Sequence, residues 1–137
     1  MNLKQSDVDL MKYRLSRSNE CLQEAKLLFD AGHYIATINR LYYSCFYSVL
    51  ALLQTKGLSS KKHSGIRALF NLEFIKTQEI PKEWSVFYAD LFENRQEGDY
   101  AEFVQFHRED VMLFMEQTQQ FNDMILQKVN KFIDKQK

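Results

Sequence analysis

Apolar residues recur at steps of three and four along most of the chain, and this spacing decides the fold class. Between Val8 and Phe29 the repeat forms one continuous seam, which is typical of an amphipathic helix. A second seam runs from Ile35 to Leu52, and two more occupy the C-terminal half. One proline and four glycines are too few for the many turns of an all-β fold. The sequence therefore predicts an all-α, up-and-down antiparallel bundle of about five helices.

The second predicted helix, residues 33–56, is apolar over most of its circumference. Such a helix is either central in its bundle or covered on one side by a partner chain. It also carries a stripe of small residues that lets another helix approach closely: Thr37, Ser44, Ser48, Ala51 and Thr55. Gly32, Gly57 and Gly98 are expected to end helices. A length of 137 residues suits one domain, so we expect residues 1–137 to form a single bundle.

The sequence also bears on where the protein works. The first ten residues are polar and acidic, unlike a secretory signal. The most apolar stretch, Leu41 to Leu53, is interrupted by serines and is shorter than the roughly 20 residues that span a bilayer. Cys21 and Cys45 show neither metal-binding nor redox spacing, which predicts reduced thiols. We therefore expect a cytoplasmic protein without a membrane segment, and no cofactor is indicated.

Charge is distributed unevenly along the chain. The formal net charge is zero, yet residues 31–72 contain no Asp or Glu. The five cations of this segment are Arg40, Lys56, Lys61, Lys62 and Arg67. A basic segment on an otherwise acidic protein can steer an anionic partner, such as nucleic acid or an acidic protein face. A chance excess of lysine around one loop remains an alternative.

Arg95 is the first candidate for a functional residue. It continues a helical stripe formed by Trp84, Tyr88 and Leu91, so it is predicted to point into the bundle. A buried guanidinium needs partners, because an unpaired buried charge is costly. Asp99 follows at the next helical turn, and the second helix offers further polar groups: Asn39, Arg40 and Tyr43. These residues form either a ligand site or an Arg–Asp bridge that fixes the helix end.

A second candidate is the segment KKHSGIR at a predicted helix start. Its phosphate-binding candidates are Lys61, Lys62, His63, Ser64 and Arg67. Free backbone N–H groups at a helix N-terminus attract anions, although the segment lacks the spacing of a Walker loop. A solvated basic loop with a serine cap is the alternative. The three histidines are too far apart to form a helical ligand pair, so no metal site is expected.

Four stretches in order resemble the HEPN family of prokaryotic proteins, named for higher eukaryotes and prokaryotes nucleotide-binding. They are NRLYYSCFYSVLALL, GLSSKKHSGIRALF, IPKE and RQEGDY. The resemblance covers roughly residues 10–125 and implies a four- or five-helix bundle that usually forms a homodimer. It also implies a shared cleft for RNA or a nucleotide. Many such proteins are encoded beside a minimal nucleotidyltransferase in toxin–antitoxin-like or defence modules.

Ribonucleases of that family carry an arginine followed, after four to six residues, by a catalytic histidine. In this chain Tyr100 occupies the first slot of that window, after four intervening residues, and His107 lies outside the window. A phenol with a pKa near 10 is a poor proton acceptor at neutral pH, whereas histidine suits that task. The sequence therefore resembles the subset with Arg-x3-Asp-Tyr in place of the ribonuclease motif. It places Tyr100 with Arg95 and Asp99 as a binding or structural site, without assigning catalysis.

Three functions remain open from the sequence. The chain is a non-catalytic HEPN module that binds a nucleotide, RNA or a nucleotidyltransferase partner. Alternatively, it is a ribonuclease toxin with an atypical site that uses Arg95 and Tyr100. The third possibility is a purely structural or adaptor dimer in which the inward arginine is only a bridge.

Overall fold

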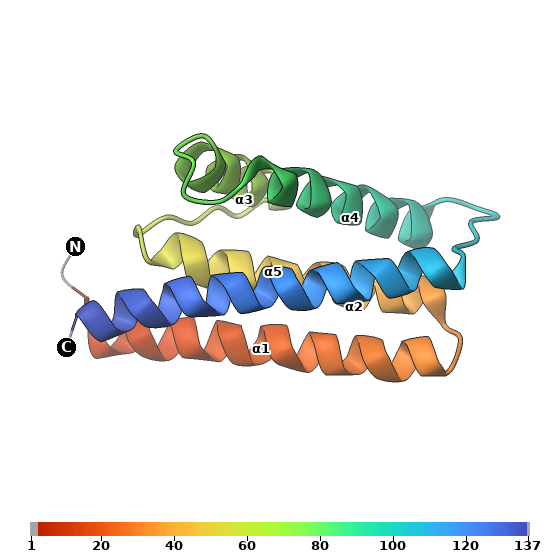
Figure 1. Ribbon diagram of the computed structural model, residues 1–137, viewed down its shortest axis with the longest axis horizontal. Helices are drawn as coiled ribbons and strands as arrows, with labels where there is room; N and C mark the ends of the chain where they lie inside the picture. The colour runs from red at the N-terminus through yellow and green to blue at the C-terminus, as the bar shows by residue number, and fades with distance from the viewer. Residues whose placement is uncertain (1–2, 137) are drawn as a thin grey trace.

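The computed structural model describes residues 3–136, and every regular element among them is helical. The elements are α1 (Gln5–Asp30), α2 (Tyr34–Gln54), α3 (His63–Phe70), the π-helical turn η1 (Asn71–Ile75), α4 (Lys82–Tyr100) and α5 (Arg108–Lys135). Helices α1, α2, α4 and α5 run alternately in opposite directions (Figure 1), so α1 begins at the end of the bundle where α5 finishes. The prediction of an all-α, up-and-down bundle is confirmed.

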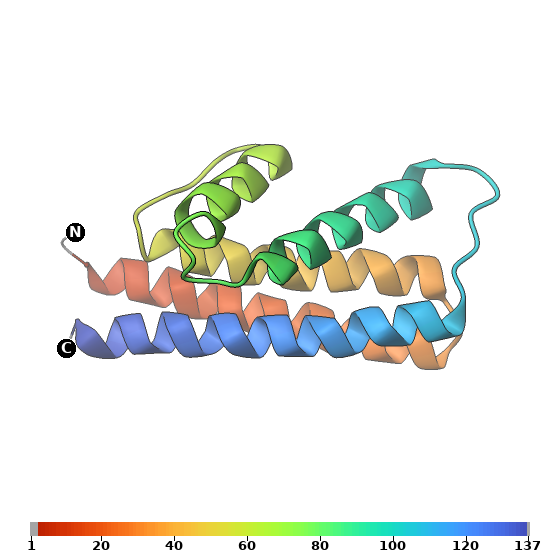
Figure 2. The same cartoon turned by 45° about the horizontal axis from the view of Figure 1, so that its top comes forward.

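Helix α2 occupies the centre of the bundle, as its nearly all-round apolar surface predicts. It packs against α1, α4 and α5 and also contacts α3. In both views α3 and α4 lie on one side of α2, away from α1 (Figures 1 and 2). One face of α2, with Tyr43, Phe46, Tyr47 and Leu50, stays only half-buried. Helix α2 is therefore the scaffold on which side chains from α3 and α4 can meet.

A polar cluster joins α1, α2 and α5 inside the bundle. Ser48 Oγ donates to Asn122 Oδ1 at 2.8 Å, and Asn122 Nδ2 donates to Ser44 Oγ at 2.8 Å. Ser44 Oγ donates to the backbone carbonyl of Ser18 at 2.7 Å, and the Ser18 and Ser48 hydroxyls lie 2.8 Å apart. Two small residues of the predicted α2 stripe thus connect α1 and α5. Buried polar groups are paired in this way because an unsatisfied one is costly.

Some of the glycines that were predicted to end helices do so, and others do not. Gly32 adopts a left-handed φ of +79° just after α1, as expected of a residue that follows a helix end. The prediction that Gly98 breaks its helix is wrong, because α4 continues to Tyr100. A Cβ at Gly98 would lie 3.0 Å from Phe106 and 3.4 Å from Ile35. Gly98 therefore provides room for these two side chains, and a helix tolerates one glycine at a cost of about 1 kcal/mol.

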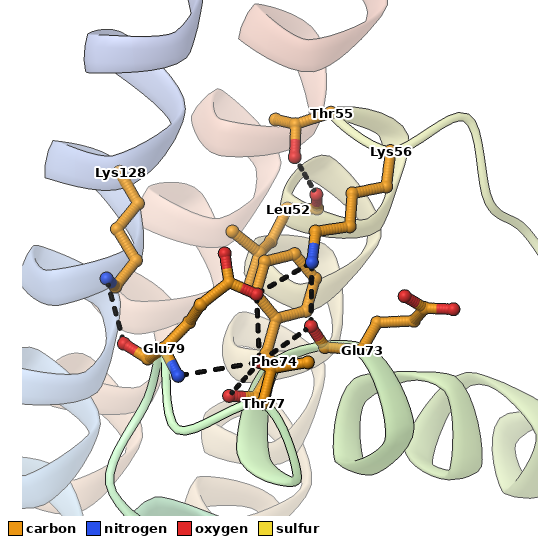
Figure 3. Close-up of polar contacts among 8 residues, drawn as sticks. All are labelled: Leu52, Thr55, Lys56, Glu73, Phe74, Thr77, Glu79 and Lys128. Carbon is orange, nitrogen blue, oxygen red and sulfur yellow. Dashed lines mark hydrogen bonds and ion pairs between the residues drawn. The ribbon is translucent and has the colours of Figure 1, made fainter.

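The connection between η1 and α4 is fastened to α2 and α5 (Figure 3). Lys56 Nζ donates to the Glu73 carbonyl and to Glu79 Oε2, both at 2.7 Å, and lies 4.3 Å from the centroid of the Phe74 ring. Lys128 Nζ donates to the Glu79 carbonyl at 3.1 Å. These contacts hold the segment after α3 against the C-terminal end of the central helix and against α5.

Candidate functional site

Arg95 lies on the face of α4 that packs against α2, and only 6% of its surface is exposed. Its guanidinium carbon is 4.9 Å from the ring centroid of Tyr42, 5.5 Å from that of Tyr43 and 5.6 Å from that of Phe92. The negative faces of aromatic rings attract a cation and stabilise it better than aliphatic side chains would. The stripe that begins at Trp84 thus carries the charge inward, as its spacing predicts.

The charge of Arg95 is only partly balanced. Arg95 Nη1 lies 3.7 Å from Asp99 Oδ2, an ion pair longer than a hydrogen bond. Arg95 Nε is buried and has no hydrogen-bond partner among residues 3–136. Buried polar atoms without a partner are rare in native proteins and require an explanation. The arrangement leaves donor capacity for an anion beside the guanidinium.

Polar residues of α2 hold Asp99 and surround Tyr43. Asn39 Nδ2 donates to Asp99 Oδ2 at 2.9 Å. Arg40 donates to Asn39 Oδ1 through Nε at 3.1 Å and Nη2 at 2.8 Å. The Arg40 guanidinium also lies 5.3 Å from the Tyr43 ring centroid, so that ring contacts the guanidinium groups of both Arg40 and Arg95. The structure therefore brings together the predicted residues Asn39, Arg40, Tyr43, Arg95 and Asp99.

Beside this network lies a cavity of about 440 Å³, here called the Arg95 pocket. It is lined by Tyr43, His63, Ser64, Phe92, Arg95, Gln96 and Tyr100. Tyr100 is 76% exposed and forms part of the rim. None of the lining residues is acidic, and the volume lies within the range of small-ligand pockets. The pocket thus joins the two sites that the sequence predicts separately.

The phosphate-binding candidates divide between the pocket and its surroundings. His63 and Ser64, at the start of α3, line the pocket. Lys61 and Lys62 are exposed immediately before α3 and do not line it. Arg67 places its guanidinium 5.0 Å from the centroid of Phe92, a lining residue. Only part of the predicted basic segment therefore faces Arg95.

His63 is fixed in the wall of the pocket. Its Nδ1 lies 2.8 Å from Tyr42 Oη, and its ring stacks on Phe46 with centroids 4.4 Å apart. Burial and the nearby positive charge of Arg95 lower the pKa of His63, while burial raises the pKa of Tyr42 to about 12. Sequence spacing reveals neither contact, because Tyr42 and Phe46 belong to α2 whereas His63 belongs to α3.

Comparison with known proteins fits this geometry. The model of the HEPN domain matches residues 11–134. The chain belongs to the HEPN family. A UPF0332 protein from Thermotoga maritima is 45% identical over 116 residues, which cover 85% of this chain and 88% of that protein. "Putative toxin MJ0142" from Methanocaldococcus jannaschii is 34% identical over 96 residues, covering 70% of this chain and 65% of that protein.

This HEPN domain keeps the arginine of the family resemblance, while a histidine reaches its pocket from another helix. His107, the first histidine after Arg95 in the sequence, lines a different cavity of about 520 Å³ together with His33.

Within residues 3–136 no three His, Cys, Asp or Glu side chains are grouped so as to hold a metal ion. Cys21 and Cys45 are both buried and unpaired. Among residues 3–136, no helix combines the length and the apolar composition that crossing a bilayer requires.

Proposed function

We propose that this HEPN domain binds a phosphate group of a nucleotide or of RNA in the Arg95 pocket. The observation that carries the proposal is the buried guanidinium of Arg95, whose Nε has no hydrogen-bond partner in the described part of the chain and which lines a cavity free of acidic side chains. Arginine presents several N–H donors in a planar arrangement that matches phosphate oxygens. A phosphate bound there would balance the guanidinium charge that Asp99, at 3.7 Å, balances only in part.

The start of α3 supports the same ligand. Ser64 lines the pocket in the first turn of this helix, where backbone N–H groups lack intrahelical acceptors. Lys61 and Lys62 are exposed just before it, within the segment that has no acidic residue. Their positive charges attract a polyanion and make its association dependent on salt. Exposed Tyr100 offers a ring on which a base can stack.

The proposal extends to the biological setting. Relatives named "Putative toxin" support a place for this protein in a toxin–antitoxin-like module. A minimal nucleotidyltransferase as partner is part of the same proposal. A homodimer is part of the proposal, supported by the half-buried aromatic face of α2 and by Phe103, which is 99% exposed. Light scattering of the purified protein, alone and mixed with the product of a neighbouring nucleotidyltransferase gene, tests both associations. A monomer that ignores that product would contradict them.

The test of phosphate binding is fluorescence anisotropy with a labelled single-stranded RNA, with ATP as competitor. Hydrogen bonds to charged groups contribute about 1.5–3 kcal/mol, so Arg95→Ala should weaken binding roughly tenfold to a hundredfold. Asp99→Asn removes the competing carboxylate but keeps an acceptor for Asn39, so it should strengthen binding. The matched control is Arg108→Ala, because Arg108 also lies over an aromatic ring, at 4.4 Å from Phe29, outside the pocket.

Circular dichroism separates a binding defect from loss of the fold. A folded Arg95→Ala variant that binds RNA and ATP as the wild type does would overturn the proposal. If Arg95→Ala fails to fold, Asp99→Asn decides, since unchanged affinity there means that the guanidinium does not contact the ligand.

RNA cleavage is a second candidate function, and the observation that favours it is His63 in the pocket with Arg95. An imidazole is a suitable proton acceptor for attack by an RNA 2′-hydroxyl near neutral pH. End-labelled RNA incubated with the protein in EDTA, and resolved on a denaturing gel, tests it. Cleavage lost in both His63→Gln and Arg95→Ala would support this function, and intact RNA would exclude it.

A further inference from the structure

His63 lines the Arg95 pocket, and one of its two ring nitrogens, Nδ1, is already hydrogen-bonded to Tyr42 in the pocket wall. We infer that His63 is a phosphate contact alongside Arg95, and that it takes up one proton from solvent when a phosphate binds. Tyr42 accommodates that proton by turning its hydroxyl from donor to acceptor. The inference rests on the proposed phosphate binding and adds a residue and a proton to it.

The geometry of the ring leaves one nitrogen for a ligand. Nδ1 is hydrogen-bonded to Tyr42 Oη at 2.8 Å. The ring is stacked on Phe46, with an angle of 14° between the planes, and packs edge-on against Tyr43, so it has little freedom to turn. Because Nδ1 is occupied, contact with a bound anion falls to Nε2. His63 and Arg95 line the same cavity, so one phosphate can reach both.

In the inferred free state at pH 7 and above, the imidazole carries no charge. The titratable or charged groups that face it are Tyr42 and Tyr43 from α2 and Arg95 from α4. None of them is a carboxylate, and the positive charge of Arg95 together with burial lowers the pKa of His63. Tyr42 keeps its proton, because burial raises its pKa to about 12. In the inferred free state Tyr42 donates to Nδ1, and the single imidazole proton resides on Nε2.

A bound phosphate reverses this balance. Its negative charge between His63 and Arg95 offsets the repulsion that keeps the imidazole neutral, and so favours protonation. The protonated ring donates through Nε2 to the phosphate and through Nδ1 to Tyr42 Oη. The Tyr42 hydroxyl must then donate elsewhere. Tyr88 Oη can accept this proton after a small shift of either ring, because it is buried without a hydrogen-bond partner among residues 3–136 and its ring stacks on Tyr42 with centroids 6.0 Å apart.

The test measures RNA affinity as a function of pH. Labelled oligouridylate is the probe, because neither its phosphodiesters nor its bases titrate between pH 5.5 and 8, and ionic strength is held constant. Uptake of one proton should tighten binding as pH falls, by up to about tenfold per pH unit between the free and bound pKa values of His63. His63→Gln should bind without this pH dependence. His33→Gln is the matched control, since His33 is an exposed histidine outside the Arg95 pocket.

Tyr88→Phe tests the role of Tyr42. This change removes the acceptor to which the Tyr42 hydroxyl turns, so the gain in affinity at low pH should shrink while binding at pH 8 stays near the wild-type value. Nuclear magnetic resonance of ¹⁵N-labelled histidine gives an independent readout. The Nε2–H tautomer should predominate in the free protein, and the pKa of His63 should be higher in the complex.

The outcomes separate this inference from the proposal beneath it. No RNA binding at any pH would overturn the proposed phosphate site itself. Binding that requires Arg95 but does not vary with pH, or that keeps its pH dependence in His63→Gln, would overturn only the role of His63. An Nδ1–H tautomer in the free protein would also contradict it, because Tyr42 would then already be the acceptor.

Discussion

Replacing Asn122 by alanine tests whether the polar cluster between α1, α2 and α5 stabilises the bundle. The change removes two hydrogen bonds of 2.8 Å, one from the Ser48 hydroxyl and one to Ser44 Oγ. Each such bond contributes about 1 kcal/mol, and the buried Ser48 hydroxyl, which keeps Ser18 as a neighbour but loses the acceptor of its proton, adds about 1 kcal/mol more. Alanine recovers up to about 0.7 kcal/mol as the better helix former. The expected loss is therefore about 2 kcal/mol.

Urea denaturation followed by circular dichroism measures this loss directly. For a chain of this size, about 2 kcal/mol corresponds to a fall in Tm of roughly 6–10 °C. Asn130→Ala is the matched control, because Asn130 is exposed on the same helix and gains the same helix propensity without losing buried hydrogen bonds. If Asn122→Ala is no less stable than Asn130→Ala, the cluster contributes no net stability and the reasoning is wrong.

Two further predictions concern the segment around α3. Gly65→Ala should destabilise the protein, because the added Cβ would overlap Ser60 Oγ and lie 2.9 Å from Ser60 Cβ; urea denaturation should show recovery in the double variant with Ser60→Gly, and no recovery would place the strain elsewhere. Lys56→Met should cost less than about 1 kcal/mol at pH 7, since the ion pair with Glu79 is largely exposed. Hydrogen bonds from Lys56 and Thr77 lower the pKa of Glu79, so its contribution is present above the unfolded pKa near 4.3 and is lost as pH falls through the lower folded value. A difference in stability between wild type and Lys56→Met that does not shrink below pH 3 would contradict this account.

Local spacing by itself determined the helices and the inward direction of Arg95. An α-helix repeats every 3.6 residues, so a seam of apolar residues shows which face is buried without reference to the rest of the chain. The same logic predicted a central α2, since few other positions bury an apolar surface on nearly all sides. The prediction that Gly98 ends its helix was wrong because this glycine makes room for Phe106 and Ile35, which approach it from other segments.

Only the tertiary structure decided the composition of the Arg95 pocket. His63 reaches Arg95 because α3 and α4 both pack on α2, and because Lys56 and Glu79 fasten the chain between them. These contacts join residues far apart in sequence, and no periodic pattern encodes their pairing. The sequence therefore separated a basic segment from an inward arginine, whereas packing against a shared central helix places both in one cavity.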